Sequence, residues 1–254
     1  MKTTIIALEL KRTLRTPEVP LFIVGLPTLM FVIFGVASPW GKFDLGNNGA
    51  NWAFAIMVNL AAYGAIIANT SMSASAALER LQGWGRQIAI TPLRDTSYVA
   101  MKALVGMAVT VLPVAVIFAI GAATKAVAKP EAWVAAVVVL LLGSLTFTFY
   151  GMGLALLLRS DMAVSIASSS TVLFGFGATM FMQLSGWMLK VAPFVPGYGY
   201  VVLARYAATG GAYMDANGRD YTDSLGVAVA NLVGWAVLFA VFALLVLRTS
   251  RGRR

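Results

Sequence analysis

Apolar residues along this chain occur in long uninterrupted runs, not in the short alternating patterns of a soluble protein. Six stretches without a charged residue exceed 20 residues, at 19–41, 45–78, 103–124, 132–158, 162–189 and 224–247. A helix needs about 20 apolar residues to cross the hydrocarbon core of a bilayer. The pattern therefore predicts six transmembrane helices near 21–37, 52–74, 98–123, 132–158, 163–184 and 224–247.

A seventh apolar run, 191–204, is too short to span a membrane. It carries four residues that disfavour regular helix: Pro193, Pro196, Gly197 and Gly199. We expect residues 185–204 to form an external re-entrant segment before the last helix. Four aromatic residues in this region form either a belt at the outer interface or a gate: Trp187, Phe194, Tyr198 and Tyr200. The following charges, Asp215, Arg219, Asp220 and Asp223, indicate a solvated loop.

Residues 1–17 combine basic and apolar positions and end at Pro17, which predicts an amphipathic helix lying at the headgroups. If six helices cross the membrane, both termini lie on one side. That side carries thirteen of the 19 Lys and Arg residues, so the positive-inside rule makes both termini cytoplasmic in a plasma membrane protein. The basic tail 248–254 is expected to contact anionic lipid headgroups, and nucleic acid is not expected as a partner.

Composition narrows the possible chemistry. The chain is 59% hydrophobic and 11% charged, and it contains neither Cys nor His. These absences exclude disulfides, thiolate catalysis and Cys-ligated metals, and they remove the usual general base. The six predicted helices also show no Asp, Glu, Lys or Arg within their charge-free runs. Because ion-coupled carriers usually place such a group in the membrane, any uphill transport would need another energy source.

A polar segment at 77–93 interrupts the apolar pattern. Leu78, Leu81, Trp84 and Ile88 recur at helical spacing, and Thr91-Pro92 ends the pattern. Each glycine beside Trp84 costs about 1 kcal/mol in a helix, so this indole is unusual. The segment predicts a short cytoplasmic helix that docks Trp84 into a partner, and a loop that follows the headgroups is the alternative.

The residues of this segment resemble the cytoplasmic loop signature of type-2 ABC exporter permeases: Glu79-Arg80, Gly83-Trp84, Arg86-Gln87 and Thr91-Pro92-Leu93. That family includes multidrug, antibiotic-resistance and polysaccharide export permeases. The resemblance covers the whole chain, including the Pro/Gly-rich external segment. There the family often reads SG-x-x-x-P-x-x-x-x-P. The match is partial, because Ser185-Gly186 precedes Pro193 and Pro196, and Lys190 stands near the usual acidic residue.

The resemblance implies an all-α, polytopic membrane protein, with residues 1–254 forming one permease domain. It implies pairing with a second permease chain, as a homodimer or a related heterodimer, and with two copies of an ATP-binding cassette subunit. The chain has no G-x-x-x-x-G-K-[ST] loop. It is therefore not expected to be an enzyme or to bind a cofactor, and the partner would hold ATP and Mg²⁺. The expected coupling helix, 77–93, would dock through Leu78, Glu79, Arg80, Gly83, Trp84, Arg86, Gln87, Thr91 and Pro92.

The resemblance also places a substrate pathway between protomers, near the second and fifth helices. Its candidate residues are Asn59, Tyr63, Asn69, Thr171, Phe174, Phe176, Thr179, Phe181 and Gln183, with an external gate at Trp187, Pro193 and Pro196. Such a pathway suits an amphiphilic or hydrophobic cargo, such as a drug or antibiotic. Export of a lipid, glycolipid or polysaccharide is an alternative, as is a membrane scaffold or immunity protein that transports nothing.

Overall fold

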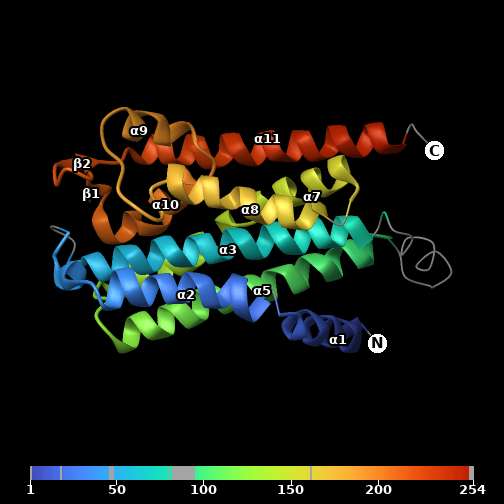
Figure 1. Ribbon diagram of the computed structural model, residues 1–254, viewed down its shortest axis with the longest axis horizontal. Helices are drawn as coiled ribbons and strands as arrows, with labels where there is room; N and C mark the ends of the chain where they lie inside the picture. Colours follow the sequence, from blue (N-terminus) through green and yellow to red (C-terminus); the bar gives the residue numbers. More distant parts are fainter. Residues whose placement is uncertain are drawn as a thin grey trace.

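Helix α3 (Trp52–Glu79) runs through the middle of a bundle of long helices (Figure 1). The computed structural model describes residues 2–17, 19–45, 49–79, 81, 95–160 and 162–251. The most apolar stretch of α3 is 100% buried, whereas that of α11 (Leu225–Arg251) is only 11% buried. The protein's own helices therefore surround α3, and the apolar surface of α11 faces outward.

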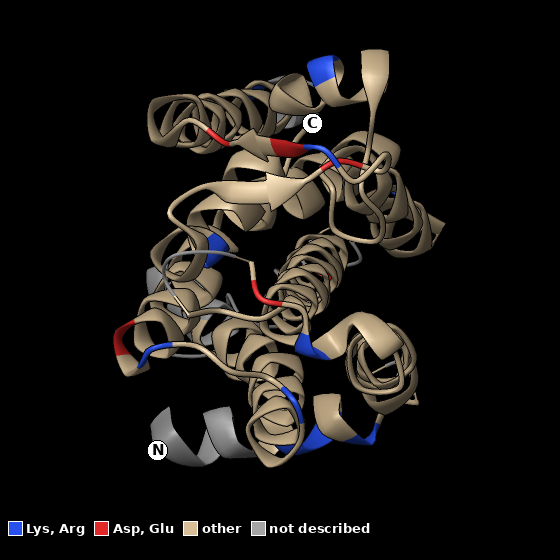
Figure 2. Cartoon of the chain, turned by 90° about the vertical axis from the view of Figure 1, so that its left-hand side faces the viewer, with Lys and Arg blue, Asp and Glu red and all other residues tan. Residues whose placement is uncertain are grey.

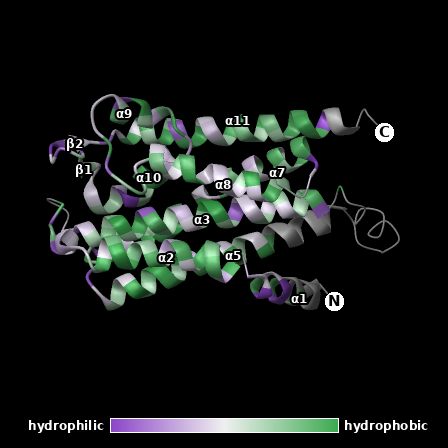
Figure 3. Ribbon diagram, viewed as in Figure 1, coloured by the Kyte–Doolittle hydropathy of each residue, from purple (hydrophilic) through white to green (hydrophobic). Residues whose placement is uncertain are grey.

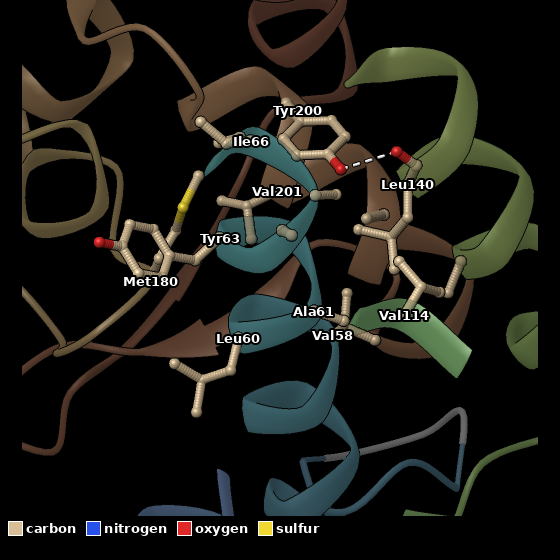
Figure 4. Close-up of a cluster of buried hydrophobic side chains, with 14 of the residues drawn as sticks. Val58, Leu60, Ala61, Tyr63, Ile66, Val114, Leu140, Met180, Tyr200 and Val201 are labelled. Carbon is tan, nitrogen blue, oxygen red and sulfur yellow. Dashed lines mark hydrogen bonds between the residues drawn. The ribbon is translucent and has the colours of Figure 1, made fainter. Parts of the chain in front are cut away.

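Small residues allow neighbouring helices to approach α3 closely. A Cβ added at Gly64 would lie 2.7 Å from Pro113 of α5 (Asp95–Ala123). A Cβ at Gly151 of α7 (Thr146–Leu158) would lie 2.2 Å from the carbonyl oxygen of Thr70. Contacts of this kind are the main source of helix association in membranes, where the hydrophobic effect between helices is weak. Around α3, the buried core includes Tyr63, Ile66, Met180 and Val201 (Figure 4).

Within the described residues, five helical segments are long and apolar enough to cross a membrane: Val19–Val36, Trp52–Glu79, Leu104–Ala123, Pro130–Leu158 and Leu225–Arg248. They match five of the six predicted helices, and polar residues gather toward the ends of the bundle (Figure 3). The prediction of a mostly helical, polytopic membrane protein is confirmed at this level.

The first span is irregular. It consists of a π-helix η1 (Val19–Gly25), a short α2 (Leu26–Phe31) and a second π-helix η2 (Val32–Val36). Pro20 and Pro27 have no N–H to donate, which disturbs regular α-helical bonding. Before this span lies α1 (Lys2–Arg15), which contacts α5, and after it comes the 3₁₀ turn η3 (Pro39–Lys42).

The fourth span is divided into α6 (Pro130–Gly143) and α7, with a break at Ser144 and Leu145. Tyr200 donates its hydroxyl hydrogen to the carbonyl oxygen of Leu140 beside this break, at 2.8 Å (Figure 4). Pro113 lies inside the continuous α5.

The fifth expected span is shorter than predicted, because α8 (Met162–Gly177) ends seven residues before position 184. The N–H of Met180 bonds to the carbonyl of Gly175, and Thr179 adopts a left-handed conformation with φ of 60°. This is the geometry of a helix-ending cap. Helix α1 and the C-terminal end of α11 lie at the same end of the bundle (Figure 1).

Two helices and a hairpin occupy the other end, which we call the hairpin end. Helix α9 (Gly186–Val191) leads through η5 (Ala192–Phe194) to α10 (Tyr198–Thr209), which packs against α6 and α11. Strands β1 (Ala212–Met214) and β2 (Asp220–Thr222) pair antiparallel, with Tyr213 opposite Tyr221. Within the expected solvated loop, Arg219 and Asp220 are exposed as predicted, but part of the segment forms this short hairpin, and Asp223 is buried.

Candidate functional site: a polar cluster and an aromatic cavity

A buried ion pair joins α10 to the segment before α11. Arg205 Nη2 lies 2.8 Å from Asp223 Oδ2, and both side chains are 1% exposed. The sequence pattern placed Asp223 in a solvated loop, and that assignment is wrong. Burying two charges costs several kcal/mol per ion unless each is paired and hydrogen-bonded, so the groups around the pair are decisive.

Four further residues complete this polar cluster, which comprises Asn59, Thr179, Tyr198, Arg205, Tyr213 and Asp223. Tyr198 donates its hydroxyl hydrogen to Asp223 Oδ1. Arg205 Nη1 donates to Asn59 Oδ1 and to Thr179 Oγ1, both at 3.4 Å. The guanidinium carbon of Arg205 also lies 3.9 Å from the centre of the Tyr213 ring.

Asn59 connects the cluster to the central helix. Its Nδ2 donates to the carbonyl oxygen of Thr179 and to the hydroxyl of Tyr213, each at 3.2 Å. Burial raises the pKa of the Tyr213 phenol, and the nearby charge of Arg205 offsets only part of that effect. The phenol therefore stays protonated at neutral pH. The cluster joins α3, the end of α8, α10 and the hairpin through hydrogen bonds arranged around one ion pair.

Thr179 occupies a strained position in this cluster. A left-handed φ is unusual for a β-branched residue, and such strain persists only where the surrounding structure imposes it. Both oxygen atoms of Thr179 are held from outside α8, since its carbonyl accepts from Asn59 and its hydroxyl accepts from Arg205. The end of α8 is thus fastened to α3 and α10.

A cavity of about 430 Å³ lies next to the polar cluster at the hairpin end. Asn59 and Tyr213 belong to both the cluster and the cavity wall. We call this space the aromatic cavity, because six aromatic side chains line it: Phe34, Trp40, Phe43, Trp52, Phe181 and Tyr213. Its other lining residues are Ser38, Ile56, Asn59, Met180, Met182, Gln183, Met214, Asp215, Ala216 and Gly218.

The cavity wall is built from segments distant in the chain. Trp52 begins α3 and stacks on Tyr213 of β1, with ring centres 5.6 Å apart and planes inclined by 18°. Asp215 follows β1, and its Oδ1 accepts the N–H groups of Asn217 and Arg219. The bond from the Arg219 N–H is the main reason that the pKa of Asp215 lies below its usual value. Asp215 is consequently a carboxylate at neutral pH.

A second hollow, of about 330 Å³, lies between the first span and α8 over α3. Phe22, Ile23 and Leu26 form one side of it, and Tyr63 and Ile67 lie on its α3 side. Helix α8 contributes three hydroxyls to its lining: Ser165, Ser168 and Ser169. Tyr63 also contacts Phe181, with ring centres 4.5 Å apart, so one aromatic pair lies between the two spaces.

The predicted pathway residues separate into three groups. Asn59, Phe181 and Gln183 line the aromatic cavity, and Tyr63 lines the second hollow. Thr179 belongs to the polar cluster. The remaining residues serve helix packing or face outward: Thr171 bonds the carbonyl of Ser168, Phe174 contacts Phe147 and Tyr150, and Phe176 is exposed.

Asn69 is also enclosed by the protein. Its Nδ2 donates to Thr110 Oγ1 at 2.9 Å and to Ser144 Oγ at 2.8 Å, while its Oδ1 accepts from Thr148 at 3.2 Å. An amide in a membrane bundle requires partners of this kind. Asn69 therefore joins α3 to α5 and to the break between α6 and α7.

The predicted gate residues lie away from the aromatic cavity. Trp187 on α9 is 73% exposed, and the carbonyl oxygen of Pro193 accepts a hydrogen bond from Asn231 on α11. Pro196 is buried in the turn before α10. Their positions place Trp187 and Pro193 on the outside of α10, where neither lines the cavity.

Most of the expected coupling helix lies outside the described residues, including Arg80, Gly83, Trp84, Arg86, Gln87, Thr91 and Pro92. Leu78 and Glu79 are described, and they form the last turn of α3. The first three residues of the expected segment therefore belong to α3.

Sequence patterns missed the ion pair and the hairpin. A turn signal was present, because Asn217-Gly218 lies between two segments that carry Tyr213 and Tyr221. No comparable signal marked Arg205 and Asp223, since a charge at the edge of an apolar run is usually solvated.

Comparison with known proteins agrees with this architecture. The family described as "ABC-2 family transporter protein" matches residues 36–248. The chain is also 29% identical over 126 residues to "Putative transport permease YvfS" of Bacillus subtilis (strain 168), which covers 48% of this chain and 51% of that protein. The aligned region thus spans about half the length of this relative. Because the family match runs from η2 to the end of α11, the chain is a membrane permease that belongs to the ABC-2 family of transporter proteins.

Proposed function

We propose that this chain is the transmembrane subunit of an ATP-driven exporter in the plasma membrane, with its hairpin end outside the cell and its termini in the cytoplasm. The distribution of charge supports this orientation. Thirteen of the 19 Lys and Arg residues fall on the side of the termini when the six expected helices are all counted. Residues 1–254 act as one permease domain, and α1 lies at the cytoplasmic headgroups.

Energy comes from two ATP-binding cassette subunits, which hold ATP and Mg²⁺. The chain has no phosphate-binding loop, so it must receive mechanical work. Helix α3 is suited to transmit it, because Glu79 at its cytoplasmic end and Asn59 in the polar cluster belong to one unbroken helix. At 1.5 Å per residue they are about 30 Å apart along its axis. A push on the segment after Glu79 thus reaches the cavity wall directly.

The cargo is amphiphilic or hydrophobic and resembles a drug or antibiotic. The observation that carries this proposal is the aromatic cavity: the described residues that line this space of about 430 Å³ include six aromatic side chains and no Lys or Arg. Pockets of this size and composition accept drug-sized molecules. Two copies of the chain, identical or related, form the pathway, and the hollow between the first span and α8 opens toward the second copy.

Reconstitution tests this function. The chain and its ATP-binding subunit are placed in inside-out vesicles, and ATP-dependent uptake of a fluorescent hydrophobic drug is measured. Trp84→Ala is expected to abolish uptake and cargo-stimulated ATP hydrolysis, because it removes the indole of the docking segment. Trp187→Ala, an exposed tryptophan at the hairpin end, is the matched control and keeps both activities.

Three results would contradict the proposal. Normal transport by Trp84→Ala would exclude the docking role, and a chain that never copurifies with an ATPase would indicate a scaffold or immunity protein. ATP-dependent movement of a labelled glycolipid but not of the drug would show that the cargo is a glycolipid.

A further inference from the structure

We propose that the aromatic cavity is a binding site for hydrophobic cations. This inference deepens the proposed function and rests on it for its role in export, but binding at the cavity is measurable without transport. Its basis is the combination of aromatic faces, a single carboxylate and a lack of positive charge in the cavity wall.

The charge in the cavity lining is negative. Among the sixteen described residues that line the cavity, only Asp215 is charged, and its carboxylate lies at the hairpin turn. The six aromatic rings add negative faces, which attract a cation that lies within about 6 Å of a ring centre. The sulfur atoms of Met180, Met182 and Met214 supply a polarisable surface that adapts to ligands of different shape.

The positive charges of Lys42, Arg205 and Arg219 lie near the cavity, but none of the three side chains is among its described lining residues. Lys42 at the end of η3 is exposed to solvent. Arg205 lies behind Tyr213, and its charge is balanced by Asp223 at 2.8 Å, so the pair as a whole is neutral. Arg219 lies in the hairpin turn and is exposed to solvent, where its field is screened, and it does not line the cavity. Figure 2 shows this end of the bundle with Lys and Arg in blue and Asp and Glu in red.

The mouth of the cavity favours a ligand that arrives from the membrane interface. Trp40 on η3 is 68% exposed while it lines the cavity, and Phe34 at the end of the first span is also exposed. A ligand with an apolar body can contact these rings, and its charged centre can approach Asp215. A strongly anionic ligand would meet the carboxylate without a compensating cation.

Binding of two ions with the same shape and opposite charge tests this inference. The purified full-length chain in nanodiscs of zwitterionic lipid is titrated with tetraphenylphosphonium and with tetraphenylborate, with empty nanodiscs subtracted for partition into lipid. Tetraphenylphosphonium is expected to bind at least about tenfold more tightly than tetraphenylborate, because only the cation is attracted by the rings and the carboxylate.

Variants locate the binding site. Asp215→Asn should weaken tetraphenylphosphonium binding by roughly fivefold, whereas Asp220→Asn, on the same hairpin but outside the lining, should change it by less than about twofold. Asn keeps an oxygen that can accept the turn N–H groups, so the hairpin can form. Trp40→Ala, whose side chain takes no part in that turn, should also weaken binding by about fivefold. Trp187→Ala serves as its control.

Equal binding of the two ions, or equal effects of Asp215→Asn and Asp220→Asn, would overturn the inference. Tight binding of tetraphenylborate alone would assign the cavity to anionic lipids. Failure of ATP-dependent uptake with intact, Asp215-dependent cation binding would refute the exporter and leave the cation site in place. Uptake of a neutral drug without cation binding would refute the cation site and leave the exporter in place.

Discussion

Arg205 and Asn59 are 146 residues apart in the sequence, and their side chains meet at 3.4 Å between Nη1 and Oδ1. This contact links α10 to the central helix. The pairing of Arg205 with Asp223 is shorter, at 2.8 Å, and both of those residues belong to the hairpin end. The hairpin end is thus held together internally by an ion pair and attached to α3 and α8 by longer, weaker hydrogen bonds. If α3 moves during transport, this attachment is where the motion reaches the hairpin end.

Loss of Asp223 should destabilise the protein strongly. Asp223→Ala leaves the guanidinium of Arg205 buried without its counter-charge, which costs about 3–5 kcal/mol. Thermal unfolding of the purified protein in detergent measures this loss. Asp220→Ala, exposed on the same hairpin, provides the control and should unfold near the wild-type temperature. Equal midpoints for the two variants would show that the pair contributes little.

Two substitutions at Thr179 separate strain from hydrogen bonding. Thr179→Val keeps the β-branched shape in a left-handed conformation but removes the acceptor for Arg205, so it should cost about 1 kcal/mol. Thr179→Asn tolerates that conformation and retains a side-chain oxygen, so stability should stay level or rise by about 1 kcal/mol. Thermal unfolding of both variants measures the difference. The reverse order would mean that the shape of Thr179, and not its hydroxyl, holds the end of α8.

Helix packing at Gly151 should tolerate no side chain. A Cβ there would lie 2.2 Å from the backbone oxygen of Thr70, which cannot move aside as a flexible side chain can. Gly151→Ala is expected to separate α3 from α7 and to cost about 1–3 kcal/mol. Gly234 on α11 has no neighbour within 4 Å of an added Cβ, so Gly234→Ala should leave the unfolding midpoint unchanged or higher. Similar losses in both variants would disprove the close approach.

The hairpin turn should weaken in acid because of Asp215. The pKa of this group is lowered by hydrogen bonds that its carboxylate accepts in the folded protein, first from the N–H of Arg219. Its contribution is therefore complete above the ordinary pKa of about 4 and is lost as the pH falls through the lowered value. Hydrogen exchange at Asn217 and Arg219 should report less protection at pH 3 than at pH 6, after correction for intrinsic rates. Asp215→Asn should remove this pH dependence, and its persistence would implicate another group.

Most of the transmembrane spans could be predicted, because hydropathy is averaged over long stretches of the sequence. Five predicted spans correspond to helices of sufficient length, and α3 begins at the predicted position 52. The end of α8 could not be predicted in the same way, since residues 178–184 carry no charge and read as a continuation of the helix. Contacts from Asn59 and Arg205 to Thr179 hold the chain out of helical conformation there.

The candidate site was only partly predictable. Asn59, Phe181 and Gln183 were expected in the pathway, and all three line the aromatic cavity. Trp40, Trp52 and Tyr213 were not expected, because each reads locally as an ordinary interfacial aromatic residue. They line one cavity only because η3, the start of α3 and β1 fold against one another.

The sequence by itself determined that this is a polytopic membrane protein, because its long uncharged runs can satisfy their backbone groups in lipid only as helices. It also indicated the family, through the order of its polar segments. Only the tertiary structure decided that Arg205 and Asp223 are buried together and that the aromatic cavity exists. The physical reason is that a charge or a ring near the end of an apolar run has the same local pattern whether water or a distant partner satisfies it. Arg205 has one partner, Asp223, 18 residues later in the sequence and another, Asn59, 146 residues earlier. Only folding brings the three residues to the same place.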